Sequence, residues 1–397
     1  MTSLNSNNID IRPIQYRDLE AVERLLELDP DECYSGATLD IGRHWEQVRA
    51  CFGLLKLLGW FPNPYRHLFC TYVAHQNNEV LGAIQVSPFN HTRTTWRIDR
   101  LATDPGAGSH DVGTALLRYC LDTIWEARTW MLEVDVSNPQ ALGLYRQNGF
   151  QPLAQLAYWN LSPETLVQLA DREPDLPNLL PANNADAQLL YQLDTVSMPP
   201  LVRQMFDRHV SDFKTHLSES VLGFIKQWAG RSRSMDAYVF EPQRKAAIGY
   251  FQIKLSEEGT FPHSTELTVH PAYTWLYPEL LSQMARITRE FPTQALQVVS
   301  TDYQSEREEY LTQVGATPVR HTLLMSRSVW HKLREAKPVS LESLQLSEVL
   351  GSLQPARKPI PTRIWLHPHS SKAEQDPGKE GDRSSRDNGH PQGDGFN

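Results

Sequence analysis

The chain has 397 residues, of which 40% are hydrophobic and 21% are charged. These proportions are those of an ordinary globular protein and exclude a largely disordered or fibrous chain. The length predicts two domains with additional segments. The formal net charge is -9 and no run of Lys and Arg is clustered in the sequence. We therefore expect no nucleic-acid partner, because binding phosphates requires a clustered basic surface.

Nothing in the sequence marks the chain for secretion or for insertion into a membrane. Residues 1–14 do not combine a basic region with an apolar stretch and a cleavage site, which predicts a cytoplasmic location. The most apolar stretch, residues 51–61, contains Lys56 and is far shorter than the roughly 20 residues of a membrane span. The cysteines are too widely spaced for a C-x-x-C pair or a disulfide scaffold, so we expect no metal and reduced thiols at Cys33, Cys51, Cys70 and Cys120.

The first part of the chain predicts a mixture of strands and helices. It opens with a short strand at 9–14, a helix at 17–28 and a second helical region near 40–58. Alternating patterns and polar turns then predict an antiparallel meander of strands at 70–75, 79–87 and 95–103. A Gly-rich turn at 104–113 follows, then a helix at 113–127, a strand at 130–136, a helix at 139–149 and a strand at 150–160.

A domain boundary is predicted just after this series. Ser162 and Pro163 have the chemistry of a helix N-cap and first helical residue, and residues 172–178 have the composition of a linker. We therefore expect a first domain at 1–162, a linker at 163–178, a second domain at 179–335 and a disordered tail at 355–397, which is rich in Ser, Gly, Pro and charged residues. The second domain predicts strands at 237–242, 246–255 and 264–273, a helix at 278–291, a strand at 295–300 and a final segment at 308–320.

The two predicted domains echo one another. Pro105 and Pro271 are 166 residues apart, and so are Gly149 and Gly315. At this offset the order of turn, helix, strand and helix is the same in both halves. An internal duplication explains this better than coincidence does.

The Gly-rich turn at 104–113 has two interpretations. Free backbone N–H groups and the positive end of the following helix make an anion cradle, into which a pyrophosphate fits. The same residues also suit an ordinary turn from a strand to a helix. A nucleotide-binding module is disfavoured, because the P-loop pattern is missing.

A more specific pattern lies in residues 138–150. It reads N-x-x-A-x-x-L-Y-x-x-x-G-F, and with the preceding LATDP and GTALL segments it resembles the GNAT acyltransferase superfamily over about residues 9–160. The resemblance implies an α/β fold with a mixed, mainly antiparallel twisted sheet flanked by helices, here duplicated in tandem. It also implies an acyl-CoA-dependent N-acyltransferase that moves an acetyl group from acetyl-CoA to a primary amine of a small molecule or peptide.

The resemblance implies where acetyl-CoA binds. The pantetheine pairs with the strand end at Leu101, Ala102 and Thr103, and the remaining contacts come from Gly108, Ser109, His110, Asp111, Val112, Gly113, Thr114, Asn138 and Tyr145. Two positions depart from the family pattern Q/R-x-x-G-x-G/A. Gly108 replaces the Arg or Gln, and Asp111 replaces a glycine, where a carboxylate weakens pyrophosphate binding unless it points to solvent or caps the helix. His110 either touches a phosphate or is solvated.

Ribosomal-protein N-terminal alanine acetyltransferases carry Glu and Tyr at the spacing of Glu133 and Tyr145. This resemblance implies that Glu133 is the general base for the amine and that Tyr145 protonates the leaving thiolate. The alternatives are a salt-bridged Glu133 at a strand edge and a Tyr145 that only packs. Asp99 assists proton removal or forms a structural pair with Arg97.

Residues 52–61 form either an apolar wall of the acceptor site or part of the core.

The second copy lacks the groups expected to bind acetyl-CoA. At the offset of 166, Tyr145 becomes Leu311, Asn138 becomes Gln304 and Gly113 becomes Glu279. Bulky Trp275 and Tyr277 occupy the turn. We expect this half to pack on the first half or to wall the acceptor site. The alternative for the whole chain is a non-catalytic CoA-binding protein.

Overall fold

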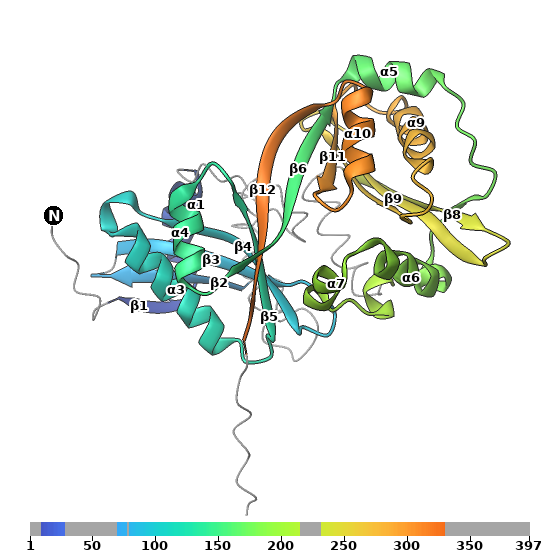
Figure 1. Ribbon diagram of the computed structural model, residues 1–397. Coiled ribbons are helices and arrows are strands. Elements are labelled where there is room, and N and C mark those ends of the chain that lie inside the picture. The colour runs from blue at the N-terminus through green and yellow to red at the C-terminus, as the bar shows by residue number, and fades with distance from the viewer. Residues whose placement is uncertain (1–8, 28–69, 78, 215–231, 330–397) are drawn as a thin grey trace, which may run out of the picture. The chain divides into compact units, whose positions relative to one another are not determined.

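The computed structural model describes residues 9–27, 70–77, 79–214 and 232–329, which all lie in one compact unit, Met1–Leu333 (Figure 1). The helical region expected near 40–58, the apolar stretch 52–61 and the tail 355–397 lie outside the described residues. Within the described part of the chain, no helix is long and apolar enough to cross a membrane.

The first half forms the predicted series of strands and helices. Its elements are β1 (Asp10–Pro13), α1 (Leu19–Glu27), β2 (Cys70–Gln76), β3 (Glu79–Pro88), β4 (Thr95–Thr103), α3 (Ser109–Thr123), β5 (Thr129–Asp135), α4 (Pro139–Gln147) and β6 (Gln151–Leu161). Strands β2, β3 and β4 pair antiparallel, as the meander predicts, and β4 pairs parallel with β5.

A connecting region follows β6. It contains α5 (Pro163–Asp171), β7 (Leu179–Pro181), α6 (Ala187–Ser197) and α7 (Pro200–Phe206). The predicted cap of α5 is confirmed, because the Ser162 hydroxyl accepts a hydrogen bond from the Thr165 amide at 3.2 Å.

The second half repeats the first. Its elements are β8 (Ser232–Glu241), β9 (Ala246–Ser256), β10 (His263–Val269), α9 (Leu276–Thr288), β11 (Leu296–Thr301), α10 (Ser305–Gln313) and β12 (Thr317–Ser328). Helices α4 and α10 both have nine residues and begin 166 residues apart. Gly149 and Gly315, which follow them, share a φ of 79°. The fold class is confirmed as a duplicated, mixed and mainly antiparallel sheet flanked by helices.

The last strands of the two halves are exchanged. The sheet runs in the order β1-β2-β3-β4-β5-β12-β6-β11-β10-β9-β8-β7. Strand β6 was expected to finish the first half, but it pairs with β11 and β12, while β5 pairs with β12 along Thr129–Asp135. Two copies of one fold have similar final strands, so each can occupy the place of the other. The two halves therefore share one twelve-stranded sheet.

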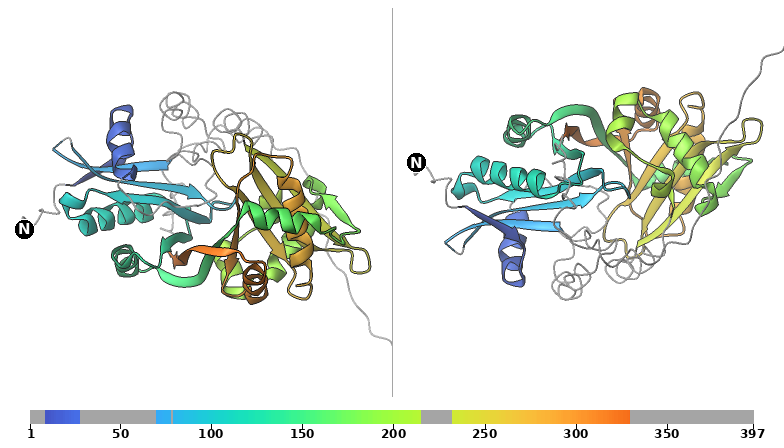
Figure 2. Two further views of the ribbon diagram at one scale, coloured as in Figure 1. Left: turned by 90° about the horizontal axis from the view of Figure 1, so that it is seen from above. Right: turned by 90° about the horizontal axis from the view of Figure 1, so that it is seen from below.

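Helices cover both faces of the first half's strands. Figure 2 shows α1 (blue) and α3 (teal) on opposite faces of β2, β3 and β4. Leu19 and Val22 of α1 pack on Val73 and Ala83. The residues that alternate with these on the strands face α3 instead, and with α4 they form the main core of this half. The face of the sheet toward α1 and the face toward α3 and α4 are therefore two separate surfaces around β4 and β5.

Candidate functional site

Strands β4 and β5 separate part of the way along their length. Their parallel pairing runs from Thr95 and Thr129 to Ile98 and Leu132, although the strands continue to Thr103 and Asp135. Asp99 and Glu133 are the first residues beyond the paired stretch. In the described part of the chain the sheet is therefore open between these two strand ends.

The opening coincides with a β-bulge in β4. Gln85 of β3 pairs with Arg100 and Val86 pairs with Ile98, so that Asp99 is an extra residue between them. A bulge bends its strand and increases the local twist, which redirects the side chain. The bulge thus turns β4 at the point where it parts from β5. Leu101, Ala102 and Thr103 follow on the diverging end of β4.

The Gly-rich turn is shorter than predicted. Helix α3 begins at Ser109, so that His110, Asp111 and Val112 are helical rather than part of a loop, while Gly113 and Thr114 lie in the helix as predicted. The Asp104 carboxylate accepts a hydrogen bond from the Gly106 amide at 2.9 Å, which closes a short 3₁₀ turn. Gly108 then adopts φ 64° and ψ 58°, a left-handed conformation that favours glycine and starts the helix. Val112, expected in the loop, is fully buried in the core beneath α3.

The first turn of α3 still has the properties of an anion cradle. The Asp111 and Val112 amides donate to the Gly108 carbonyl oxygen at 2.9 Å and 3.4 Å, so the amides that precede them are the ones that could bind an anion at the positive end of the helix dipole. Gly108, His110 and Asp111 are exposed at this end. Because Asp111 is exposed, its carboxylate lies in solvent at the helix start. This is the orientation in which Asp111, in place of the glycine of the family pattern, is compatible with a bound anion.

Gly113 and Thr114 pack toward α4. A Cβ added to Gly113 would lie 2.9 Å from Cδ2 of Leu144, so a glycine here allows α3 and α4 to approach closely. The Thr114 hydroxyl accepts a hydrogen bond from the Asn148 side chain at 3.2 Å. The structure gives both residues a packing role, and any contact with acetyl-CoA stays a prediction.

Asn138 and Tyr145 shape helix α4. The side-chain oxygen of Asn138 accepts a hydrogen bond from the Ala141 amide at 3.0 Å and caps the helix. The Tyr145 ring is buried and meets Phe150 edge to face, with 5.9 Å between the ring centroids. It belongs to the same core as Leu132 and Val134, which face α3 and α4.

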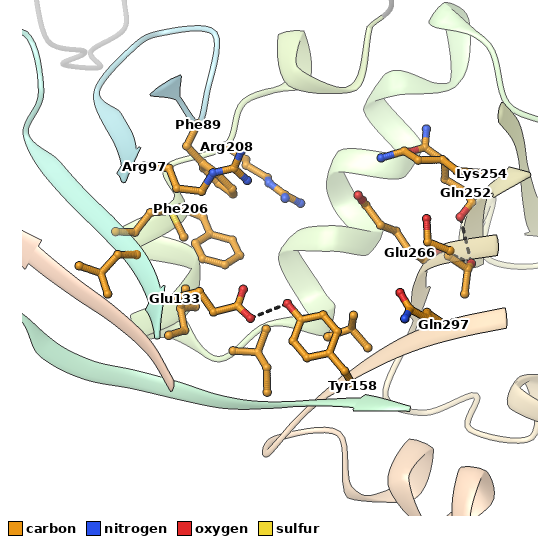
Figure 3. Close-up of a pocket in the computed structure, with 17 residues that line it drawn as sticks. Phe89, Arg97, Glu133, Tyr158, Phe206, Arg208, Gln252, Lys254, Glu266 and Gln297 are labelled. Carbon is orange, nitrogen blue, oxygen red and sulfur yellow. Dashed lines mark hydrogen bonds between the residues drawn. The ribbon is translucent and has the colours of Figure 1, made fainter. Parts of the chain in front are cut away.

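A pocket of about 280 Å³ lies on the opposite face of β5 (Figure 3). Residues of both halves line it. They are Phe89, Arg97, Met131, Leu132, Glu133, Leu156, Tyr158, Phe206, Arg208, Gln252, Lys254, Ser264, Thr265, Glu266, Gln297, Val299 and Leu324. The second half thus contributes to the wall of this pocket, and its expected role in walling an acceptor site stays a prediction.

Glu133 lies at this pocket and is held by two hydroxyl groups. Its Oε1 accepts hydrogen bonds from Tyr158 of β6 and, at 2.7 Å, from Thr322 of β12 (Figure 3 shows the bond from Tyr158). None of the described cations forms an ion pair with Glu133. The neighbouring carboxylate, Asp135, is instead paired with Arg320 at 2.9 Å. Because β12 comes from the second half, the strand exchange completes the surroundings of Glu133.

Asp99 forms the predicted pair with Arg97. The Arg97 Nε lies 2.7 Å from the Asp99 Oδ1, and Asp99 is only 5% exposed. Burial raises the pKa of Asp99, while the charge of Arg97 acts in the opposite direction. Arg97 also lines the pocket. The pair brings a buried carboxylate close to the pocket, with the arginine between.

The structure brings some predicted residues together and separates others. Glu133, Asp99 and the diverging end of β4 lie around the opening in the sheet, whereas Tyr145 packs on the face opposite the pocket. The sequence did not indicate Tyr158 or Thr322. Tyr158 belongs to no motif, and Thr322 reaches Glu133 only through the exchanged strand.

The second half has a corresponding strand divergence, and an arginine fills it. Strands β10 and β11 pair over His263–Thr265 and Leu296–Val298. Beyond this stretch, Arg307 of α10 donates hydrogen bonds to the carbonyl oxygens of Leu267 at 2.6 Å and Val299 at 2.8 Å. The guanidinium also lies 5.4 Å from the ring centroid of Tyr277. The backbone at the positions that correspond to Leu101 and Glu133 is therefore already bonded within the protein.

The residue that replaces Gly113 in the second half has a structural contact. Glu279 of α9 is buried, forms an ion pair with Arg172 and accepts a hydrogen bond from the Asp175 amide at 2.7 Å. These two partners belong to the linker. The first turn of α9 is therefore in contact with the linker, whereas the corresponding first turn of α3 is exposed. Among the described residues, no three His, Cys, Asp or Glu side chains are placed to hold a metal ion.

Residues 23–150 match the model of the Acetyltransferase (GNAT) family. A tandem GNAT protein from the clavulanic acid biosynthesis pathway, solved without acetyl-CoA, has 13% identity and a TM-score of 0.51, over 81% of this chain and 98% of that one. This likeness supports the fold and its duplication. No match is found among the curated proteins.

Two further structures are similar over different lengths. A GCN5-related N-acetyltransferase from Sphaerobacter thermophilus has 12% identity and a TM-score of 0.49, over 82% of this chain and 97% of that one. Ard1 from Thermoplasma volcanium has 25% identity and a TM-score of 0.28, over 37% of this chain and 86% of that one.

Proposed function

We propose, from the premise that residues 23–150 form a domain of the acetyltransferase (GNAT) family, that this chain is an acyl-CoA-dependent N-acyltransferase. It transfers an acetyl group from acetyl-CoA to a primary amine of a small molecule or peptide. The observation that carries the proposal is the opening between β4 and β5, because Glu133 lies at that opening and faces a pocket on one side of the sheet. The start of α3 follows the other strand of the same opening.

The residues around the opening fit acetyl-CoA. The ends of β4 and β5 are not paired with each other beyond Ile98 and Leu132, which leaves the end of β4 at Leu101–Thr103 for the pantetheine. The exposed first turn of α3 after Gly108 suits the pyrophosphate. Acetyl-CoA supplies a thioester carbonyl when it is bound.

The amine binds in the pocket on the Glu133 side. Glu133 removes a proton from the ammonium, because an amine attacks only as the free base. The nitrogen then forms a bond with the thioester carbonyl carbon, the C–S bond breaks, and the sulfur leaves with the electron pair. Tyr145, on the α4 side of the sheet, donates its hydroxyl proton to the thiolate, and the second proton that the nitrogen loses on forming the amide passes through solvent to the Tyr145 oxygen. Tyr158 and Thr322 keep the Glu133 carboxylate in place, and the pocket holds the amine near the opening.

The test combines binding and turnover on one preparation. Isothermal titration with acetyl-CoA should give one site per chain, and thiol release should be measured across a panel of primary amines. Glu133→Gln and Tyr145→Phe should each lower kcat by about 10²- to 10⁴-fold, the usual contribution of a general base or acid, with little change in the Kd of acetyl-CoA.

Two results would count against parts of this proposal. Full activity in a stable Tyr145→Phe protein would remove that residue from the reaction and leave solvent to protonate the thiolate. Binding of acetyl-CoA with no turnover on any amine would favour a non-catalytic CoA-binding protein.

A further inference from the structure

Most of the side chains that β9, β10 and β11 contribute to the pocket are polar. Five side chains from β9, β10 and β11 line it, and we call them the polar wall: Gln252, Lys254, Ser264, Glu266 and Gln297. They lie at neighbouring positions on one face of the sheet. Ser264 pairs with Lys254 on one side and with Gln297 on the other, and Glu266 pairs with Gln252. Figure 3 shows four of these residues on the side of the pocket opposite Glu133.

The polar wall differs from the other polar groups of the pocket in its bonding. Arg97 is paired with Asp99, Arg208 is paired with Asp194 at 2.9 Å, and Glu133 is bonded to two hydroxyl groups. The five side chains of the polar wall make no hydrogen bond or ion pair with any residue in the described ranges. Polar groups that line a pocket and lack partners in the protein are the groups that orient a ligand.

The charges of the polar wall define what it can bind. Lys254 and Glu266 lie on adjacent strands, and no ion pair links them. The Lys254 ammonium therefore has its charge available for an anion, and the Glu266 carboxylate for a cation. Gln252, Ser264 and Gln297 beside them offer donors and acceptors for the same ligand. A group that carries a carboxylate and an ammonium next to each other matches this arrangement.

We propose that the acceptor is a small diamino acid, whose α-amino acid head group binds the polar wall while its side-chain amine reaches Glu133. This inference rests on the proposed function. Lys254 binds the carboxylate of the head group and Glu266 binds its α-ammonium. The pocket volume of about 280 Å³ suits a small molecule. In this arrangement the first half carries the reacting groups and the second half recognises the acceptor.

The experiment compares four amines that differ at the head group. L-Lysine and L-ornithine have the whole group, 6-aminohexanoate lacks the α-ammonium, and pentane-1,5-diamine lacks the carboxylate. Calorimetry gives the Kd of each for the full chain, and thiol release with acetyl-CoA gives kcat and KM. We expect L-lysine or L-ornithine to bind about 10- to 100-fold more tightly than pentane-1,5-diamine, with the difference in KM rather than in kcat.

Two variants distinguish the two charges. Lys254→Met should weaken the binding of the diamino acids and 6-aminohexanoate by about 10- to 100-fold and leave pentane-1,5-diamine unchanged. Glu266→Gln should weaken the diamino acids and leave 6-aminohexanoate unchanged. Lys214→Met and Glu257→Gln change exposed residues outside the pocket and are the matched controls. Both should leave the Kd of every amine unchanged.

The results separate this inference from the proposed function. Equal binding of L-lysine, L-ornithine and pentane-1,5-diamine would overturn the inference, and so would a Lys254→Met variant that weakens all four amines alike. The selective pattern in calorimetry without any thiol release would support the polar wall and contradict the proposed transfer. Thiol release with no selectivity would support the transfer and overturn the polar wall.

Discussion

The two halves of the chain share one fold and differ where paired strands separate. In the first half, β4 and β5 part at Ile98 and Leu132, and Asp99 and Glu133 lie at the opening. In the second half, the residues at the corresponding positions are Thr265 and Val299. Arg307 bonds there to the carbonyl oxygen of Val299 and to that of Leu267, the counterpart of Leu101.

This difference shows that one side chain can fill the gap between two diverging strands while the fold around it stays the same. Arg307 stands where the first half has Ala141, and it is only 3% exposed. A buried guanidinium with two carbonyl partners replaces the contacts that a ligand would make. The strands around it keep their order, so the second half remains able to exchange its last strand and to wall the pocket of the first.

The largest effect is expected from separating the halves. A fragment that ends at residue 162 keeps β5 but loses β12, so that β5 has an exposed edge and β6 has lost both of its partners. The fragment can restore a partner for β5 only by moving β6 into the place of β12, so we expect it to be strongly destabilised relative to the longer chain, as measured by urea unfolding with circular dichroism and by gel filtration.

The control for this truncation is a fragment that ends at residue 333, the limit of the compact unit. It should fold and bind acetyl-CoA with the Kd of the full chain. A folded fragment 1–162 with that same Kd would show that the exchanged strand is dispensable.

Removing the arginine that closes the second divergence should be strongly destabilising. In Arg307→Met, the buried carbonyl oxygens of Leu267 and Val299 lose their donor. Each unpaired buried group costs about 1–3 kcal/mol, so the free energy of unfolding in urea should fall by about 2–6 kcal/mol. Arg289→Met, which breaks an exposed pair with Asp171, should cost less than about 1 kcal/mol. A similar small loss in both variants would refute the structural role of Arg307.

A smaller effect tests the contribution of the second half to Glu133. Thr322→Val keeps the shape of the side chain and removes the hydroxyl that donates to Glu133 at 2.7 Å. A hydrogen bond to a charged group is worth about 1.5–3 kcal/mol, which sets an upper range of about 10- to 150-fold for the fall in kcat/KM. Thr322→Ser restores a hydroxyl and should recover most of the activity. If serine and valine variants are equally active, Thr322 does not position Glu133.

The sequence was sufficient to predict most elements of the fold. Periodicity and turn chemistry located the meander, and the constant offset of 166 residues predicted the duplication that α4 and α10 confirm. The start of α3 was missed, because the polar and glycine residues at 104–113 have loop composition. Only the left-handed conformation of Gly108 and the burial of Val112 explain why the helix starts at Ser109.

The site could be predicted only in part. Glu133 was identified through the resemblance to N-terminal alanine acetyltransferases, and Asp99 because it lies on the predicted strand at 95–103. The partners of Glu133 were not, since no pattern within one strand states which strand lies beside it. Thr322 is 189 residues from Glu133 along the chain and reaches it only after the strand exchange. The polar wall was missed for the same reason.

The halves also differ at the position next to the divergence, where Arg97 of the first half corresponds to His263 of the second. Arg97 reaches the pocket with its charge paired to Asp99. His263 is fully buried, and its Nδ1 accepts a hydrogen bond from the Ser256 amide at 3.0 Å. A ring nitrogen that accepts a hydrogen bond must be unprotonated, and burial also lowers the pKa of His263 below its ordinary value of 6.5.

The smallest predicted effect follows from this neutral histidine. Below about pH 6.5 the unfolded chain takes up a proton at residue 263 that the folded protein resists, so stability is full above that pH and falls as the pH is lowered. The slope from one such group is at most about 1.4 kcal/mol per pH unit. His263→Asn keeps an acceptor near Nδ1 but cannot be protonated, so its free energy of unfolding in urea should decline less between pH 7.5 and 5.5 than that of the unchanged protein. Parallel declines in the two proteins would show that His263 is already able to take up a proton in the folded state.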